Sequence, residues 1–264
     1  MTRIGPLLYN RNDVYIGRSL EKYGDYSLAE ANLFRQLLRQ GMTAIDAGAN
    51  IGVHTVLLSQ LVGPRGNVIA YEPQRLVFQT LCANLALNQC TNVRARNAGV
   101  ADNAGSARVP VLSPERKTNF GRVSLDGTET DELVSVVTID AEELTACDLL
   151  KIDVEGWELR VLRGAAWTIR QCQPVIYVEN DRRDRSPELI SALLELDYRL
   201  YWHICPLFSQ DNFNQDMDNV FPGIVTVNLV CLPQSSHWKV DQFLRPVSGI
   251  DDWWQPPPEA ESQA

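Results

Sequence analysis

The sequence predicts an α/β fold in which a mostly parallel sheet carries helices on both faces. Two observations support this prediction. Apolar stretches of strand length alternate with stretches of helical period, a pattern typical of parallel strands joined by right-handed crossovers. In addition, the segment Thr43 to Gly52 (TAIDAGANIG) joins the first predicted strand to a helix through closely spaced glycines. Such a turn builds a pocket for a nucleotide-like cofactor at the end of a strand.

Local patterns predict each element in turn. Ser27-Leu28-Ala29-Glu30 has the pattern of a capping box, which predicts the start of a helix that ends near Gly41. Strands are then expected near residues 43–47, 67–72, 92–97, 148–152 and 174–178, and helices near residues 51–62, 74–87, 157–164 and 186–196, the last capped by Ser186 with Pro187 as its first helical residue.

Two regions depart from this alternation. Residues 98–147 hold only two short extended pieces, 107–112 and 133–139, around a long polar loop, and loops of that length are usually functional. The last two extended runs, 198–204 and 224–232, have no helical stretch between them, which predicts an antiparallel pair. The sequence therefore predicts a seven-stranded sheet with an antiparallel last strand.

The length and composition limit the organisation and the partners of the chain. A chain of 264 residues suits one main domain. The net charge of −9 argues against a broad electrostatic contact with nucleic acid or an anionic membrane and favours a small-molecule or neutral substrate, while a homo-oligomer stays open. We expect an N-terminal segment and helix over residues 1–40, the main α/β domain over 41–233 with an insertion near 98–147, and a tail rich in proline and tryptophan over 234–264.

The cysteines and the apolar runs bear on the compartment. Six cysteines are scattered without any C-x-x-C pair, so we expect reduced thiols in buried positions. No apolar run is long enough to span a bilayer, and the first residues are too polar for a signal peptide. A cytoplasmic protein is therefore expected.

The predicted cofactor site centres on the glycine turn. Gly48 and Gly52 lack a Cβ, so backbone can approach a ligand closely there. Asp46 is expected at the carboxyl end of the first strand. Glu72 ends the second strand about 20 residues after Gly52, the usual offset of a carboxylate that binds ribose hydroxyls. The other predicted members are Asn50 in the turn and Gly99 and Val100 after the third strand, beside the adenine ring.

The spacing of the turn helps to choose the cofactor. The turn lacks the first glycine spacing of a pyrophosphate binder, and the carboxylate of Asp46, two residues before Gly48, would repel a pyrophosphate. It suits the ammonium group of S-adenosylmethionine instead. The antiparallel pair at the end is a second indication of the Rossmann-like class I methyltransferase fold.

Several blocks of the sequence resemble the FkbM-type methyltransferases. They are Ile45 to Gly52 (IDAGANIG), Tyr71-Glu72-Pro73, Leu150 to Glu158 (LKIDVEGWE) and Val161-Leu162-Arg163-Gly164. The third block is the specific part, because a glycine turn alone marks only the superfamily. The resemblance covers roughly residues 25–232. It implies S-adenosylmethionine as methyl donor and O-methylation of a hydroxyl on a sugar or secondary metabolite.

Methyl transfer is an in-line displacement, so the enzyme must align the acceptor oxygen and accept the hydroxyl proton. Residues just past the fourth and fifth strands face the methyl group in such a fold. This selects Asp153, Glu155 and Glu179 as proton acceptors, with Asp153 also near the cofactor and Asn180 on the substrate side. His203, at the end of the sixth predicted strand, is a further candidate base.

Metal and substrate sites are predicted from the same region and from the long loop. Catechol-type O-methyltransferases resemble this plan and hold Mg²⁺ with an acid after strand four and an acid–Asn pair after strand five. Asp153, Glu179 and Asn180 would repeat that set, with Glu in place of the usual Asp. The loop residues expected to contact a polyhydroxylated acceptor are Lys117, Asn119 and Phe120.

Three alternatives stay open at this point. Methylation of a nitrogen or carboxyl acceptor would use an identical donor site. A non-catalytic cofactor-binding module would keep the donor site without turnover. A dehydrogenase would bind NAD⁺ with a similar arrangement of glycines and acid.

Overall fold

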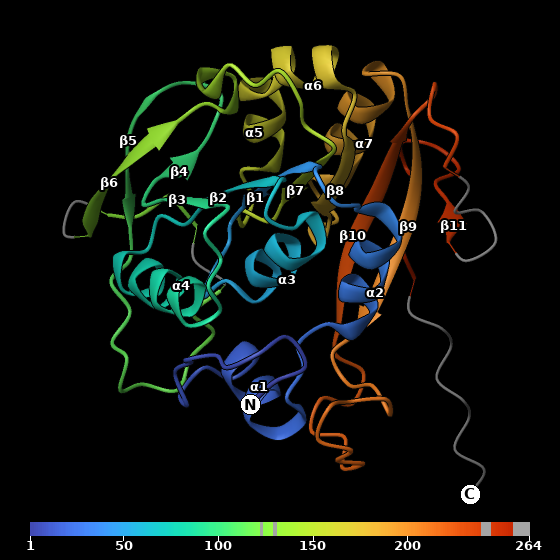
Figure 1. Cartoon of the computed structure of the whole chain (residues 1–264). Coiled ribbons are helices and arrows are strands. Elements are labelled where there is room, and N and C mark those ends of the chain that lie inside the picture. Colours follow the sequence, from blue (N-terminus) through green and yellow to red (C-terminus); the bar gives the residue numbers. More distant parts are fainter. Residues whose placement is uncertain (122–123, 129–130, 239–243, 256–264) are drawn as a thin grey trace, which may run out of the picture.

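One twisted sheet of eight strands forms the centre of the computed structural model, which describes residues 1–121, 124–128, 131–238 and 244–255 (Figure 1). The strand order is β11-β9-β10-β8-β7-β1-β2-β3. The strands are β1 (Thr43–Ala47), β2 (Asn67–Tyr71), β3 (Val93–Arg96), β7 (Leu149–Ile152), β8 (Val175–Glu179), β9 (Tyr198–Pro206), β10 (Val225–Pro233) and β11 (Arg245–Pro246).

The strand directions confirm the predicted α/β fold. β1, β2, β3, β7 and β8 are parallel, whereas β10 is antiparallel to both β8 and β9. The predicted number of seven strands was wrong by one. The two-residue β11, from the tail, pairs antiparallel with β9 and adds an eighth strand at the edge.

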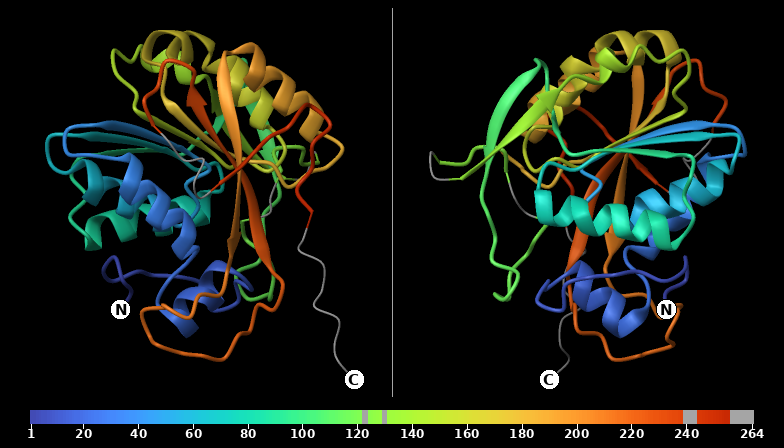
Figure 2. Two further views of the ribbon diagram at one scale, coloured as in Figure 1. Left: turned by 90° about the vertical axis from the view of Figure 1, so that its right-hand side faces the viewer. Right: turned by 60° about the vertical axis from the view of Figure 1, so that its left-hand side comes forward.

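Helices cover both faces of the sheet, as predicted (Figure 2). On one face α2, α3 and α4 pack against the strands, and Phe34 of α2 meets Tyr177 of β8 edge to face at 5.0 Å. On the other face α5, α6 and α7 bury Val161, Ile169 and Ile190 against β7 and β8. The helices are α1 (Ile16–Tyr23), α2 (Leu28–Leu37), α3 (Val53–Val62), α4 (Arg75–Leu87), α5 (Glu158–Gly164), α6 (Ala166–Cys172) and α7 (Ser186–Glu195), with a short 3₁₀ turn at Ile139–Glu142.

A second, smaller sheet occupies the region predicted as an insertion. β5 (Gly105–Val109) pairs antiparallel with β6 (Glu132–Val137), and β4 (Gly99–Val100) runs parallel to β6. The two predicted extended pieces therefore pair with each other, although both begin earlier than predicted. Trp157 packs with Val109 and Val136 and so attaches this sheet to the main domain.

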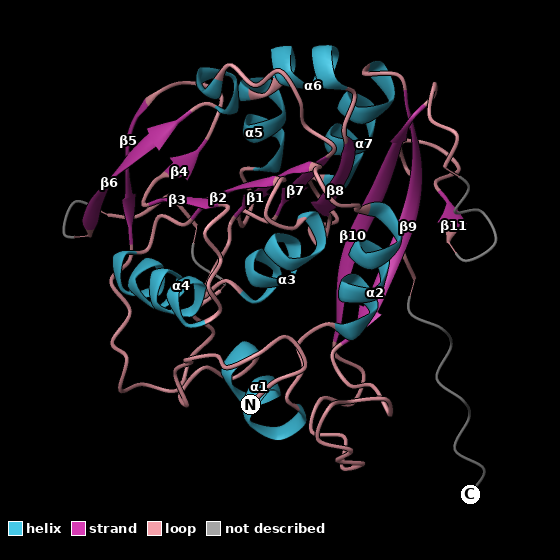
Figure 3. Cartoon of the chain, in the orientation of Figure 1, coloured by secondary structure: helices cyan, strands magenta, loops and turns pink. Residues whose placement is uncertain are grey.

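The N-terminal segment lies beside the connection between β9 and β10, although about 200 residues separate them in the chain (Figures 1 and 3). Helix α1, which the sequence analysis did not predict, is held there by its last turn. Lys22 forms ion pairs of 3.0 Å with Asp216 and 2.9 Å with Asp218. The hydroxyl of Tyr23 donates a hydrogen bond of 2.9 Å to the carbonyl oxygen of Asp218. These contacts place residues from both segments over one end of the sheet.

The predicted capping box at the start of α2 was wrong. Ser27 has a left-handed backbone with a φ of 44°, and its side chain makes no capping hydrogen bond. Glu30 turns inward instead of back toward the helix start, and only 5% of its surface is exposed. The sequence pattern of a capping box is present, but the Glu30 carboxylate contacts residues distant in the chain and makes no capping contact at the start of α2.

Candidate active site

A pocket of about 240 Å³ lies at the carboxyl ends of the central strands. Parallel strands place their carboxyl ends at one edge of a sheet, which is where open α/β sheets bind ligands. The pocket extends from β2 and β4 at one end, here called the donor end, across β1 and β7 to β8 and β10 at the other, here called the acceptor end. The donor end includes Gly48, Asn50, Glu72, Gly99, Val100, Asn119 and Leu125, and the acceptor end includes Tyr15, Tyr26, Glu155, Glu179, Asp181, Leu207, Ile224 and Val225.

Two glycines allow the turn after β1 to lie close against its neighbours. Gly48 has a φ of 84°, and a Cβ on it would lie 1.7 Å from the carbonyl oxygen of Asp153. Gly52 has a φ of 89°, and a Cβ there would lie 2.5 Å from Leu81 of α4. Any side chain at Gly48 would therefore push the turn away from the end of β7, which explains the requirement for glycine.

The carboxylate of Glu72 is fixed by backbone amides at the donor end. It accepts hydrogen bonds of 2.9 Å from the Asn50 amide and 2.8 Å from the Gln74 amide, and 3% of the residue is exposed. Burial raises the pKa of Glu72 to about 7, against the effect of these amides. Each oxygen keeps further acceptor capacity, so the geometry is compatible with ribose hydroxyls. Gly99 and Val100 line the same end.

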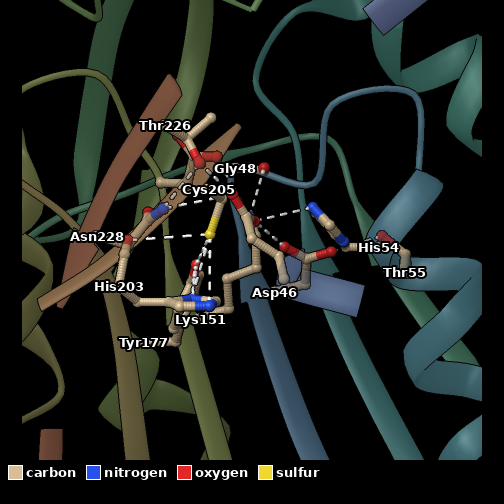
Figure 4. Close-up of polar contacts among 12 residues, drawn as sticks. Asp46, Gly48, His54, Thr55, Lys151, Tyr177, His203, Cys205, Thr226 and Asn228 are labelled. Atoms are coloured by element: carbon tan, nitrogen blue, oxygen red, sulfur yellow. Dashed lines mark hydrogen bonds and ion pairs between the residues drawn. The ribbon is translucent and has the colours of Figure 1, made fainter. Parts of the chain in front are cut away.

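The structure places Asp46 differently from its predicted contact with the cofactor. Asp46 is fully buried and does not line the pocket. One of its oxygens accepts a hydrogen bond of 2.7 Å from Thr55, and the other forms an ion pair of 3.1 Å with Lys151 (Figure 4). Lys151 does line the pocket, so Asp46 influences the pocket only indirectly, by holding the ammonium group of Lys151 in place.

Lys151 joins the donor end to the acceptor side, and the sequence analysis missed it. Its ammonium group also lies 3.5 Å from Asp153 and 3.5 Å from the carbonyl oxygen of Gly48. Burial alone would lower the pKa of Lys151, but the charges of Asp46 and Asp153 raise it above its usual value. A lysine inside an otherwise apolar strand was the available signal, because lysine is seldom fully buried without a partner.

Three carboxylates meet at the acceptor side of β7 and β8. Asp153, Glu155 and Glu179 each bring one oxygen within 4.8 Å of the others, and we call them the acid cluster. Burial and the neighbouring carboxylates raise the pKa of Glu155 to about 7 and that of Glu179 well above its usual range. Arg182 forms an ion pair of 3.0 Å with Glu155. The structure thus brings together the three acids that the sequence analysis proposed as proton acceptors.

Asn180 does not join these acids, so the predicted metal set is not assembled. Its side-chain amide donates a hydrogen bond of 2.9 Å to Ser186 at the start of α7, and the residue lines a neighbouring cavity instead. Ser186 is already the first helical residue and Arg185 occupies the cap position, so the predicted role of Ser186 as cap was wrong. The prediction that Asn180 faces the substrate is corrected by the same contact.

His203 was expected to face the acceptor, and the structure corrects this placement. It is buried in β9 behind the pocket, and its Nδ1 lies 3.0 Å from the Tyr177 hydroxyl and 3.3 Å from the sulfur of Cys205 (Figure 4). Burial lowers the pKa of His203. The alternation of side chains along β9 turns this imidazole toward the core.

The predicted loop residues divide among different surroundings. Lys117 is exposed and does not line the pocket. Phe120 is buried outside it, and its carbonyl oxygen accepts a hydrogen bond of 2.8 Å from Gln74. Asn119 does line the pocket, but at the donor end with Gly121. None of these three predicted residues lies at the acceptor end.

Glu30 and His54 form a buried pair beside the acceptor end. Glu30 lies 3.1 Å from Nε2 of His54 and accepts hydrogen bonds of 2.6 Å from Thr226 and 3.3 Å from Asn228. Burial acts to raise the pKa of Glu30, but these contacts outweigh it and bring the pKa to about 2. The Glu30 carboxylate therefore links α2, α3 and β10. The sequence analysis missed this role because it assigned Glu30 to a capping box.

Taken together, the sheet order and the pocket define a Rossmann-like methyltransferase fold. Among solved structures the chain is similar to the precorrin 8w decarboxylase of Methanobacterium thermoautotrophicum, at 12% identity over 86% of this chain and 99% of that one, with a TM-score of 0.50. That likeness shows the fold alone. The model of the methyltransferase FkbM domain matches residues 46–200, and the chain belongs to this family.

Two curated relatives are also similar over part of their length. The methyltransferase sdnD of Sordaria araneosa is 31% identical over 46% of this chain, and the hexuronic acid methyltransferase AglP of Haloferax volcanii is 30% identical over 50%. The chain spans 59% and 53% of these two relatives, little more than half of each. Among the residues that the structure describes, no helix has the length and apolar character needed to cross a membrane.

Proposed function

We propose that this chain binds S-adenosylmethionine and transfers its methyl group to a hydroxyl of a sugar, glycan or natural product. The observation that carries the proposal is the acid cluster, which shares one pocket with the donor end. The family supports methyl transfer, and a relative named for a hexuronic acid supports a sugar acceptor. Methylation of a nitrogen or a carboxyl group is the alternative, because it would use the same donor end.

The donor end has groups that fit each part of the proposed cofactor. The Glu72 carboxylate suits the ribose hydroxyls, and the small, apolar surface at Gly99 and Val100 suits the adenine ring. The turn at Gly48 lies close to Asp153, so backbone groups and no side chain would face the amino-acid part of S-adenosylmethionine there. When bound, S-adenosylmethionine supplies an electrophilic methyl group, whose bond to sulfur breaks with the electron pair left on sulfur.

The acid cluster supports the acceptance of the hydroxyl proton. Three carboxyls this close are not all ionised together, so the cluster shares a proton. Glu179 keeps it best, because the pKa of Glu179 is raised well above its usual range. Burial raises the pKa of Asp153 above its usual value, but the charge of Lys151, 3.5 Å away, opposes this rise, and neither of the other two acids lies so close to Lys151. We therefore assign proton acceptance to Asp153, with Glu155 as the second ionising member as the pH passes about 7.

Two finer points belong to the proposal. A cation such as Mg²⁺ would have to use Asp153, Glu155 and Glu179, since Asn180 is held by Ser186. The compartment we propose is the cytoplasm, in keeping with six cysteines that are all free thiols.

The test is isothermal titration with S-adenosylhomocysteine, with Mg²⁺ or with EDTA. We expect micromolar binding, weakened by about 1–3 kcal/mol in Glu72→Ala through loss of the ribose contact. Glu188→Ala, which removes an exposed carboxyl on α7, is the matched control and should bind like the wild type. Unchanged affinity in Glu72→Ala would place the ribose elsewhere, and binding of NAD⁺ instead would favour a dehydrogenase. A folded protein that binds neither would contradict the proposed donor site, and one that binds S-adenosylhomocysteine without methyl transfer to any acceptor would be a non-catalytic module.

A further inference from the structure

The acceptor end is rich in carboxylates, and the cations near it are already paired. Lys151 is shared between Asp46 and Asp153. Arg182 lies 3.0 Å from Glu155 and 3.8 Å from Asp181. His54, the other basic side chain of the pocket, is paired with Glu30. The carboxylates that line this side are Glu30, Asp153, Glu155, Glu179 and Asp181.

The acid cluster also lacks hydrogen-bond donors. The Oε2 atom of Glu179 is buried and has no hydrogen-bond partner among the residues that the structure describes. Glu155 accepts from Arg182, and Asp153 has only the long contact of 3.5 Å with Lys151. A ligand that brings O–H donors would complete these carboxylates, whereas a ligand that brings only acceptor oxygens would leave them unpaired.

The acceptor end also presents aromatic and aliphatic surface. Tyr26 lines the same pocket as the acid cluster. Tyr15 contacts Phe221 of the β9–β10 connection, with ring centroids 6.2 Å apart. The remaining apolar lining is Ile16, Leu207, Ile224 and Val225. This end of the pocket therefore combines hydrogen-bond acceptors with apolar surface that can cover the face of a ring.

We infer that the acceptor presents a hydroxylated ring without a carboxylate or phosphate group to this end of the pocket. The inference rests on the proposed function and makes its substrate class specific. An acceptor carboxylate would be one more acid beside the cluster, and the described residues that line this end offer no unpaired cation to balance it. Like charges this close cost several kcal/mol.

The test uses the full chain, methyl-labelled S-adenosylmethionine and matched acceptors. The panel contains neutral glycosides and phenols, the corresponding uronates and sugar phosphates. We expect label in neutral members at a rate at least about ten times that for any anionic counterpart, because juxtaposed like charges are disfavoured by more than 1.4 kcal/mol. The transferred methyl should survive mild alkali, as an ether does and a methyl ester does not.

Two variants sharpen this test. Asp181→Asn keeps the shape of a side chain that lines this end of the pocket but removes its charge, so turnover of uronates relative to neutral acceptors should rise about threefold or more. Glu188→Gln, at an exposed position of α7 outside the pocket, should leave that ratio unchanged. Binding of S-adenosylhomocysteine within about twofold of the wild type would show that Asp181→Asn is folded.

The outcomes separate the inference from the proposed function. Alkali-labile label in uronates, preference for phosphates, or label in a uronate or phosphate while no neutral acceptor is labelled would each overturn the inference alone. Absence of S-adenosylhomocysteine binding to folded protein would overturn the proposed function. A constant acceptor ratio in Asp181→Asn would also contradict the inference, because the negative charge of this end would then not select the acceptor.

Discussion

The donor end of the pocket is built from backbone and nearby sequence, whereas the acceptor end is built from side chains of distant segments. At the donor end, Glu72 is held by the amides of Asn50 and Gln74, all close together in the chain. At the acceptor end, Tyr26 precedes the family-matched residues 46–200 and Ile224 follows them. The family-matched residues therefore form the donor end and the acid cluster, whereas segments before and after them complete the acceptor end.

Lys151 lies between the donor end and the acceptor end of the pocket and pairs with Asp46 and Asp153. We therefore expect its removal to have the largest effect of the changes considered. Lys151→Met would leave Asp46 charged and fully buried without its partner, and we expect a loss of about 3–5 kcal/mol in the free energy of unfolding. Urea denaturation at pH 7 measures this loss. The double variant Asp46→Asn/Lys151→Met removes both charges and should regain part of the stability. A loss below about 1 kcal/mol in the single variant would mean that Asp46 is not a buried, paired charge.

The same difference explains how much of the molecule could be predicted from the sequence. The sheet, the glycine turn and Glu72 follow from local patterns, since apolar period and spacing from a glycine are readable along the chain. The two strand ends also gave Asp153, Glu155 and Glu179, because parallel strands place their carboxyl ends together. The positions of all these residues could be predicted from the fold class, without knowledge of contacts between distant segments.

What could not be predicted depends on which way a side chain turns and on contacts across the fold. Asn180 follows Glu179 directly, yet it turns to Ser186 and not to the acids. His203 lies on the buried side of β9. Tyr26 reaches the pocket only because the N-terminal segment is bound by the β9–β10 connection through contacts such as Lys22–Asp216. No local pattern records such pairings.

The donor end should be sensitive to a single methyl group. In Gly48→Ala the added Cβ would overlap the Asp153 carbonyl oxygen, so we expect binding of S-adenosylhomocysteine to weaken about 100-fold or more. Gly41→Ala is the matched control, because Gly41 has a similar φ of 89° but nothing within 4 Å of its Cβ position. Titration calorimetry compares the two variants. Equal weakening in both would assign the effect to backbone strain and not to the close approach of the turn.

The buried pair beside the acceptor end gives a pH-dependent effect. The pKa of Glu30 is lowered from 4.5 to about 2 in the folded protein, so its contribution to stability is present above pH 4.5 and is lost as the pH falls toward 2. The stability advantage of the wild type over Glu30→Gln should therefore shrink by about 2–3 kcal/mol between pH 5 and pH 2.

Urea denaturation of both proteins across this range measures that difference, and the comparison isolates Glu30 from the other titrating acids. The pKa values of Glu72 and Glu155 are raised to about 7, so these groups make the folded protein less stable as the pH rises from 4.5 to 7. Both proteins retain them, so their effect cancels in the difference. An advantage that is independent of pH would show that the Glu30 carboxylate is not selectively stabilised by His54 and Thr226, and that α2 is attached to β10 by packing alone.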